Sequence, residues 1–331
     1  MSSTHGVPSL LSILDRHDGG KLSTVGPSVG LPLHNADIRE DKIMKLVRFA
    51  TNDIPSTPGV MIDDAVIALG DLLPEAPTDM IGFIDRWEEI KGPLTKRIAG
   101  RPVSPVRDAT LLAPIERPGK ILAIGLNYAD HIAEAKDAGV KIPTEQVWFC
   151  KQPTSVNSPF GGIHKPIISD QLDYEVELVV VIGKKGRRIS AERAPDYVFG
   201  YTVGNDVTVR DWQQKTPQWM LGKSFDTHCP YGPSIVTVDE IGDPHVLGVR
   251  SLVNGELRQN SNTRHLVFNI WQQIAELSQA MTLEPGDLIF TGTPGGVGFG
   301  FKPPRPLVVG DTVRCEVDKI GAIENRVIAE V

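Results

Sequence analysis

Residues 173–182, Asp-Tyr-Glu-Val-Glu-Leu-Val-Val-Val-Ile, place acidic side chains directly before a run that is apolar at every position. A strand that is apolar on both faces is buried on both faces. Alternate side chains of a strand share a face, so Asp173, Glu175 and Glu177 are expected to point the same way. Buried carboxylates need a cation or close partners. This segment therefore predicts a buried strand whose acids meet a positive charge.

Two of these acids have the spacing of a metal site. Glu175 and Glu177 leave a strand roughly 6.6–7 Å apart, and their carboxylates can close on one hard cation at ~2.0–2.6 Å. Mg²⁺, Mn²⁺ and Ca²⁺ suit such oxygen ligands. Asp206, which ends the β-rich run 200–205, offers a third carboxylate on a rigid element. The alternatives are a half-exposed strand with its acids in water and a simple Asn-Asp turn.

Composition excludes several classes of protein. The chain has 331 residues, 40% hydrophobic and 23% charged, with a formal charge of −7, so neither disorder nor attraction to nucleic acid is expected. No apolar run approaches the ~20 residues that cross a bilayer, so no membrane partner is expected. The three cysteines contain no C-x-x-C pair, and residues 1–15 lack a basic signal region. We therefore predict a cytoplasmic enzyme or binding protein.

The chain divides into three parts. Residues 1–44 have little periodicity and form an N-terminal extension. Residues 45–117 form a small domain, with strands at 45–49, 59–62 and 65–69, a helix at 80–98 and a proline-rich linker. The third part, 118–331, is richer in strands. Its predicted strands are 121–125, 174–182, 199–205, 288–290, 312–317 and 326–331, with a hairpin at 246–259 around Asn-Gly and helices at 128–138 and 265–281. The fold class is therefore mixed α/β and β-rich.

Other residues suggest acid–base chemistry. His131 and Glu134 lie three residues apart on one helical face, where the carboxylate can orient the imidazole to remove a proton from water. Lys223 follows Gly222 and can stabilise an oxyanion. Arg210 and Gln213 can share one side of a turn that faces an anionic substrate. Each of these residues has an alternative role as an ordinary solvated surface side chain.

A glycine-rich loop at 291–300 follows the predicted strand 288–290. Its glycines let backbone N–H groups approach an anion. The loop matches neither the nucleotide P-loop nor the Rossmann fingerprint, so no nucleotide site is predicted.

Taken together and in order, five motifs resemble those of the fumarylacetoacetate hydrolase family. They are residues 119–131, 173–178, 201–211, 222–226 and 291–298. The resemblance covers about 118–331, and 45–117 is similar to the small N-terminal α+β domain of the longer, two-domain members. It implies a catalytic domain built on a rolled mixed β-sheet and a homodimer.

The resemblance also implies roles for single residues. Mg²⁺ or a similar cation would be held by Glu175, Glu177 and Asp206. A His131–Glu134 dyad on a helical lid and Lys223 would carry the catalysis. The residues implied to contact the substrate are Tyr128, Arg210, Gln213 and Thr293.

The implied activity is hydrolysis of a carbon–carbon bond in a ketonic substrate, a 1,3-dicarbonyl or acylpyruvate-type 2-oxo acid, in the catabolism of aromatic compounds or sugar acids. The metal polarises the carbonyl, His131 activates water, and Lys223 stabilises the departing enolate. Decarboxylation of an oxaloacetate-like acid and keto–enol tautomerisation are alternatives at the same site. A protein that binds a metal-chelating acid without turnover, or a metal-dependent phosphodiesterase, is a more distant alternative.

Overall fold

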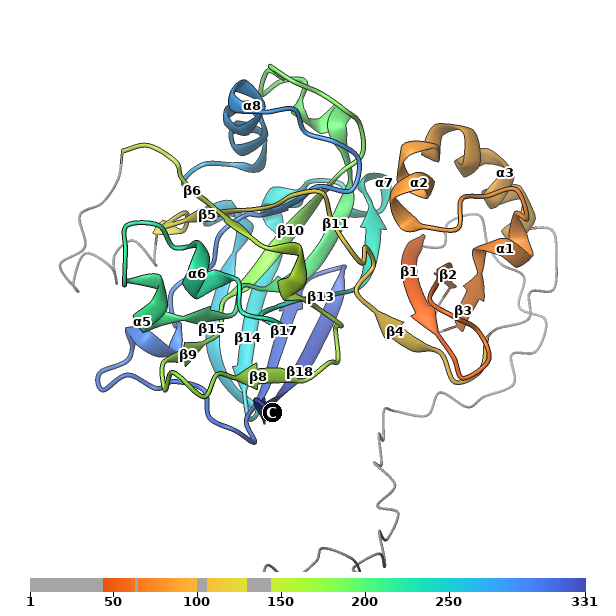
Figure 1. Ribbon diagram of the computed structural model, residues 1–331. Helices are drawn as coiled ribbons and strands as arrows, with labels where there is room; N and C mark the ends of the chain where they lie inside the picture. The colour runs from red at the N-terminus through yellow and green to blue at the C-terminus, as the bar shows by residue number, and fades with distance from the viewer. Residues whose placement is uncertain (1–43, 63–64, 100–105, 130–143) are drawn as a thin grey trace, which may run out of the picture. The chain divides into compact units, whose positions relative to one another are not determined.

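The computed structural model describes residues 44–62, 65–99, 106–129 and 144–331 (Figure 1). Its N-terminal elements are β1 (Lys45–Ala50), β2 (Thr57–Ile62), β3 (Ala65–Ala68), α1 (Leu69–Leu72), α2 (Met80–Asp85), α3 (Trp87–Ala99) and β4 (Thr110–Leu112).

The elements that follow are more often strands. The strands are β5 (Ile121–Gly125), β6 (Val147–Lys151), β7 (Val156–Asn157), β8 (Ile163–Lys165), β9 (Leu172–Asp173), β10 (Val176–Ile182), β11 (Val198–Asn205), β12 (Thr208–Val209), β13 (Cys229–Thr237), β14 (Gly248–Val253), β15 (Glu256–Asn262), β16 (Leu288–Phe290), β17 (Thr312–Val317) and β18 (Gly321–Ala329). The α-helices are α5 (Arg210–Gln213), α6 (Met220–Lys223), α7 (Val238–Ile241) and α8 (Ile270–Ala280). Short 3₁₀ turns cover Pro153–Ser155, Ala194–Tyr197, Pro244–Val246, Thr263–His265 and Gly298–Gly300.

Two sheets build most of the fold. The larger runs in the order β3-β2-β1-β13-β11-β10-β16-β5-β6, and the smaller in the order β15-β14-β17-β18-β8. The larger sheet is mixed, because β16 pairs with β5 in parallel whereas β10 pairs with β11 and β16 in antiparallel fashion. The strand-rich, mixed α/β fold predicted from the sequence is confirmed.

The apolar run of β10 is buried on both faces, as predicted. Leu178 and Val180 belong to a core shared with residues of β14, β17 and β18. Val179 and Val181 belong to a second core, which includes residues of α2 and α3. Every residue of β10 is buried. A strand with a core on each side is a rigid support for the side chains at its ends.

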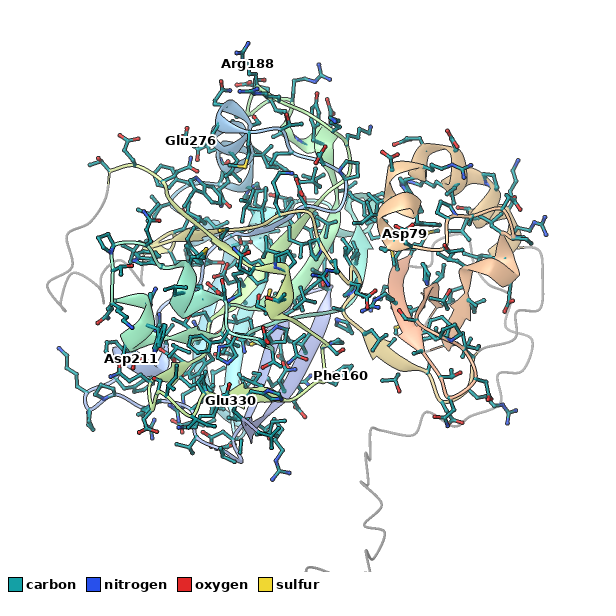
Figure 2. The ribbon with its side chains drawn as sticks, viewed as in Figure 1. Asp79, Phe160, Arg188, Asp211, Glu276 and Glu330 are labelled. Carbon is teal, nitrogen blue, oxygen red and sulfur yellow. The ribbon has the colours of Figure 1, made fainter. Side chains whose placement is uncertain are left out.

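The N-terminal strands continue the large sheet, because β1 pairs with β13 through Lys45 and Leu46. Asp79, labelled in Figure 2, lies at the start of α2. It caps this helix by accepting a hydrogen bond from the Gly82 N–H at 2.9 Å. The division into an extension, a small domain and a catalytic domain stays a proposal.

The single helix expected at 80–98 is wrong, because the helical backbone breaks at Arg86. The break brings the rings of Phe83 and Trp87 to 5.6 Å, and Trp87 meets Phe199 of the sheet edge-on at 5.3 Å. Aromatic packing against the sheet therefore accompanies the division of one predicted helix into two.

Other predicted boundaries also shift. The helix expected at 265–281 begins at Ile270, because Asn269 and Gln272 form a reciprocal capping box. The strand expected at 326–331 covers Gly321–Ala329 instead. The Asn254-Gly255 hairpin is confirmed, with both residues at positive φ. None of the helices in the described ranges is long and apolar enough to cross a membrane.

Candidate metal centre and active site

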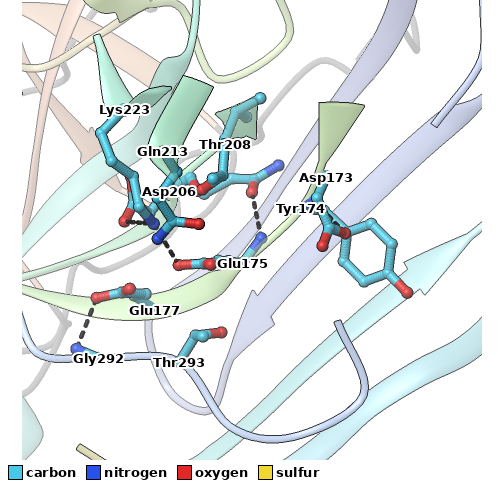
Figure 3. A network of polar contacts seen from close by, with 12 residues as sticks. Asp173, Tyr174, Glu175, Glu177, Asp206, Thr208, Gln213, Lys223, Gly292 and Thr293 are labelled. Carbon is cyan, nitrogen blue, oxygen red and sulfur yellow. Dashed lines mark hydrogen bonds and ion pairs between the residues drawn. The ribbon is translucent and has the colours of Figure 1, made fainter. Parts of the chain in front are cut away.

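Three buried carboxylates meet where β10 and β11 lie side by side (Figure 3). Glu175 directly precedes β10, Glu177 is its second residue, and Asp206 directly follows β11. The antiparallel register pairs Val176 with Asn205, which brings the three side chains together. One oxygen of each carboxylate lies within 4.8 Å of the others. The three acids that the sequence analysis named as metal ligands therefore lie together, and their binding of a metal stays a prediction.

The strand containing the acids is interrupted, which corrects one expectation. β9 ends at Asp173 and β10 begins at Val176, so the predicted strand 174–182 starts two residues later. Asp173 does not join the cluster of Glu175, Glu177 and Asp206. Its carboxylate instead accepts the backbone N–H groups of Gly298 at 2.7 Å and Phe299 at 2.9 Å. Asp173 therefore anchors the glycine-rich loop.

Burial among other acids raises the pKa of Glu177 well above its usual value. Burial is the main cause, and the charges of Asp206 and Glu175 add to it. Lys223 and the Gly292 N–H, which donates to Oε2 of Glu177 at 2.6 Å, act in the opposite direction. Gly292 has a φ of +101°, a conformation that favours glycine. Part of the predicted anion-binding role of the loop is thus directed at the chain's own carboxylate.

Lys223 places an ammonium group against two of the acids. Its Nζ lies 2.8 Å from Oε2 of Glu175 and 2.6 Å from Oδ2 of Asp206. Burial alone would lower the pKa of Lys223, but the two carboxylates outweigh burial and the net shift is upward. A Cβ on Gly222 would lie 2.2 Å from the Gln213 nitrogen, so glycine there allows α5 and α6 to pack closely. Lys223 is therefore a buried, protonated group at the cluster.

A second buried lysine was not predicted. Lys151, at the end of β6, donates from Nζ to Oδ1 of Asp206 at 2.7 Å and to the carbonyl of Val207 at 3.2 Å. It also contacts the carbonyl oxygen of Lys223. The available signal was a lysine that ends the predominantly apolar run Val-Trp-Phe-Cys at 147–150. Buried lysines are rare unless they are paired, and this one is paired with Asp206.

Arg210 is held among acceptors of the protein itself. Its Nε lies 2.8 Å from Oδ2 of Asp173, and its Nη1 lies 2.6 Å from Oε1 of Glu175. Nη1 also donates to Oε1 of Gln213 at 3.1 Å, so the predicted pair of Arg210 and Gln213 does share one side of the turn. In this structure Arg210 orients Glu175. Its contact with substrate stays a prediction.

Thr293 and Tyr128 both lie in this part of the fold. The Thr293 hydroxyl donates to the Val176 carbonyl at 2.9 Å and accepts from the Gln259 amide at 2.8 Å. Tyr128 is fully buried, and its backbone pairs with that of Leu266. Their substrate contacts stay predictions.

Asn127 is a residue that sequence reasoning did not single out. Its side-chain amide donates to the carbonyl oxygens of Phe268 at 3.0 Å and Thr291 at 2.8 Å. Its Oδ1 accepts the N–H of Phe268 at 2.8 Å. Asn127 therefore ties the segment after β5 to the glycine-rich loop and to the approach to α8. His131 and Glu134 of the predicted lid lie outside the described residues.

Comparison with known proteins assigns the family. The fumarylacetoacetate hydrolase C-terminal family matches residues 120–328. An oxaloacetate tautomerase of Xenopus laevis is 44% identical over 304 residues, which are 90% of this chain and 94% of that protein. An oxaloacetate tautomerase of Rattus norvegicus is 43% identical over 291 residues, covering 86% of this chain and 92% of the relative.

Solved structures of the same family resemble this chain. A fumarylacetoacetate hydrolase of Exiguobacterium antarcticum is 37% identical with a TM-score of 0.72, and the match covers 87% of this chain and all of that one. A maleylpyruvate hydrolase of Sphingobium, solved with manganese(II) and pyruvate, is 33% identical with a TM-score of 0.74 over the same shares. Sequence, fold and site agree that this chain belongs to the fumarylacetoacetate hydrolase family and is an enzyme.

Proposed function

We propose that the protein is a divalent-metal-dependent keto–enol tautomerase that acts on oxaloacetate or a similar 2-oxo diacid. The observation that carries the proposal is the buried cluster of Glu175, Glu177 and Asp206, in contact with the ammonium group of Lys223. The relatives of Xenopus laevis and Rattus norvegicus, which match most of this chain, are named as oxaloacetate tautomerases. This proposal follows an alternative that the sequence left open rather than its first choice, hydrolysis.

The donor set fits a hard divalent cation. Three carboxylates converge with oxygens within 4.8 Å of one another, and carboxylate oxygens are the ligands that Mg²⁺, Mn²⁺ and Ca²⁺ prefer. We propose Mg²⁺ or Mn²⁺, supported by the manganese in the Sphingobium maleylpyruvate hydrolase structure. A bound cation would polarise the carbonyl of a 2-oxo acid and favour its enolate.

The charge balance supports an anionic substrate. The acidic side chains at the centre are Asp173, Glu175, Glu177 and Asp206, and the basic ones are Lys151, Arg210 and Lys223. With all of them ionised, four acids and three bases leave a single negative charge, which a divalent cation would reverse to a single positive charge. Such a site favours a dianion.

The proposed proton transfers use the residues of this chain. Tautomerisation removes a proton from the carbon beside the carbonyl group and places one on the carbonyl oxygen, with no change in the atoms of the substrate. The ammonium group of Lys223 would stabilise the negative charge that develops on that oxygen. His131, oriented by Glu134, would remove and return the carbon-bound proton.

Hydrolysis of an acylpyruvate is the second candidate function. It is favoured by the likeness to the Sphingobium maleylpyruvate hydrolase, whose structure holds pyruvate. Here His131 would instead deprotonate water, which attacks the acyl carbonyl. The bond between that carbon and its neighbour breaks, and its electrons leave as an enolate near Lys223. Decarboxylation of oxaloacetate would use the same stabilised enolate.

One comparison of substrates tests the proposal. Metal-loaded enzyme is mixed with enol-oxaloacetate, and the loss of enol absorbance is compared with the uncatalysed rate, alongside assays of carbon dioxide release and acylpyruvate cleavage. We expect accelerated enol loss that exceeds both other activities, and a loss of about 10²–10⁴-fold in His131→Ala. Efficient acylpyruvate cleavage without acceleration of enol loss would assign the second function instead.

The homodimer and the cytoplasmic location stay proposals. Several relatives carry the word mitochondrial in their names, so a mitochondrial location is the alternative. Sedimentation of the purified chain and fractionation of cells that produce it would test both.

A further inference from the structure

Two aromatic rings stand beside the charged centre. The ring of Phe149 lies 4.9 Å from Nζ of Lys223, measured to the ring centroid. The ring of Trp219 packs against Phe149 with 5.6 Å between centroids and a tilt of 59°. The same Nζ lies within 2.8 Å of both Glu175 and Asp206. The pair of Phe149 and Trp219, called the aromatic wall below, therefore reaches the acidic cluster through Lys223, which Phe149 contacts.

Local structure explains why the wall faces the site. Phe149 and Lys151 are alternate residues of β6, so they share a face of the strand, and Lys151 reaches Asp206 from that face. Trp219 directly precedes α6 with helical dihedral angles, and it lies four residues before Lys223. Residues four apart in a helical backbone lie on the same side. Both rings thus approach the cluster on elements that also carry its lysines.

A glycine leaves the space in which Trp219 packs. A Cβ on Gly125, at the end of β5, would lie 2.2 Å from Cζ3 of Trp219. The indole occupies the space that a side chain at this position would need. A ring seated in this way against the backbone of a strand cannot retreat from the site without losing that packing.

The wall has surface left for a ligand. Phe149 and Trp219 are partly exposed, whereas Glu175, Glu177, Asp206, Lys151 and Lys223 are all buried. Partly exposed apolar surface beside a charged centre is the combination by which small-molecule sites orient a ligand and select its shape. Neither aromatic residue was expected from the sequence to have a role in the site.

We propose that Phe149 and Trp219 determine substrate specificity by limiting the bulk that a 2-oxo acid carries next to its carbonyl group. The inference rests on the proposed function for the class of substrate. A flat, fixed wall admits a small or planar group such as the methylene of oxaloacetate or its planar enol. It clashes with a branched substituent.

The test compares ligands that differ only in bulk. Manganese-loaded wild type and Trp219→Ala are titrated by calorimetry with pyruvate and with trimethylpyruvate, whose three added methyl groups are next to the carbonyl. One misfitting methylene in an apolar pocket is worth roughly 10–200-fold. We expect wild type to prefer pyruvate and Trp219→Ala to reduce that preference by at least about tenfold, with Phe149→Ala acting in the same direction.

A matched control removes a tryptophan elsewhere. Trp271, on α8, packs edge-on against His245 at 5.2 Å, and the ring pairs of the described residues do not join it to Phe149 or Trp219. Trp271→Ala should leave the ratio of the two dissociation constants unchanged. An unchanged ratio in a Trp219→Ala protein that melts cooperatively would overturn the inference.

Turnover separates this inference from the proposed function. If wild type accelerates enol-oxaloacetate loss but Trp219→Ala keeps the wild-type ratio of dissociation constants, only the inference about the wall is overturned. If wild type binds both 2-oxo acids but does not accelerate enol loss, the tautomerase proposal is overturned. The ratio of dissociation constants would still decide whether the wall sets specificity. If wild type binds neither acid, the inference about the wall is overturned, and the enol assay still decides on the tautomerase proposal.

Discussion

The Nζ of Lys151 lies 2.7 Å from Oδ1 of Asp206, and both side chains are fully buried. The same ammonium group also contacts the backbone carbonyls of Val207 and Lys223. One buried charge therefore connects a candidate metal ligand with the backbone of the lysine that faces the cluster. The edge strand β6 is in this way tied to the centre of the site.

Replacing Lys151 by methionine should destabilise the protein strongly. Breaking a buried ion pair by removing one partner costs up to about 3–5 kcal/mol. Asp206 keeps Lys223 as a partner here, but two buried backbone carbonyls also lose their donor. Urea unfolding of the metal-free protein measures this loss. The control is Lys91→Met, which breaks a surface pair with Asp239 that is similarly short, at 2.6 Å, but about half exposed. That change should cost no more than about 1 kcal/mol. Equal losses would show that the Lys151 contact is worth no more than a surface pair.

Glu177→Gln should weaken metal binding without unfolding the protein. Burial and the neighbouring acids raise the pKa of Glu177, so ionised Glu177 is opposed in the metal-free protein. A neutral amide of similar size relieves that repulsion but is a weaker ligand for a divalent cation. We expect Mn²⁺ affinity to fall by at least about tenfold, measured by calorimetry, with an unchanged or higher melting temperature without metal. Full turnover after exhaustive chelation would contradict the metal assignment altogether.

A buried histidine should make stability fall in acid. Burial lowers the pKa of His228 to about 3, while its Nε2 lies 2.8 Å from the His164 carbonyl oxygen. In the unfolded chain this histidine has an ordinary pKa near 6.5. Between about pH 6.5 and 3 it is therefore protonated in the unfolded chain but neutral in the folded protein. The stability that neutral His228 contributes is therefore fully present above about pH 6.5 and is lost as the pH falls towards 3.

The variant His228→Gln isolates this contribution. Relative to wild type, it should lose about 2 kcal/mol less stability between pH 7 and pH 5. Lys151 and Asp206 influence the same imidazole in opposite directions, so the comparison is made by denaturant unfolding in metal-free buffer. Parallel pH profiles for the two proteins would show that His228 is not the responsible group.

The sequence predicted the acidic cluster because local patterns carry most of it. The continuous apolar run of β10 predicted burial on both faces. Asn205-Asp206 ended the neighbouring strand at the end that lies beside the acids of β10. Lys223 was found beside a glycine, although its contact with both acids depends on the packing of α6 against α5. These features need only short-range periodicity and one pairing of neighbouring strands.

Other parts depend on contacts that the sequence does not display. β13 contains Pro230 and Pro233, which argue against a strand between β1 and β11. The sheet nevertheless includes β13. Pro230 aligns with Asn157 of the short strand β7, and the register between β13 and β11 shifts between Tyr201 and Val203. Lys151 was missed for a related reason: its partner, Asp206, is 55 residues away.

The last prediction concerns Lys223 and separates binding from catalysis. Its ammonium group lies 2.6 Å from Asp206 and 2.8 Å from Glu175, so it repels any cation bound by the same two carboxylates. Lys223→Met should therefore bind Mn²⁺ at least as tightly as wild type, whereas Glu177→Gln binds it more weakly. Turnover of enol-oxaloacetate should nevertheless fall by about 10²–10³-fold, the usual effect of removing one group that stabilises an oxyanion. Calorimetry and the enol assay on the same preparation measure both quantities. Wild-type turnover in Lys223→Met would show that Lys223 only neutralises the acids, and weakened Mn²⁺ binding would show that it positions them.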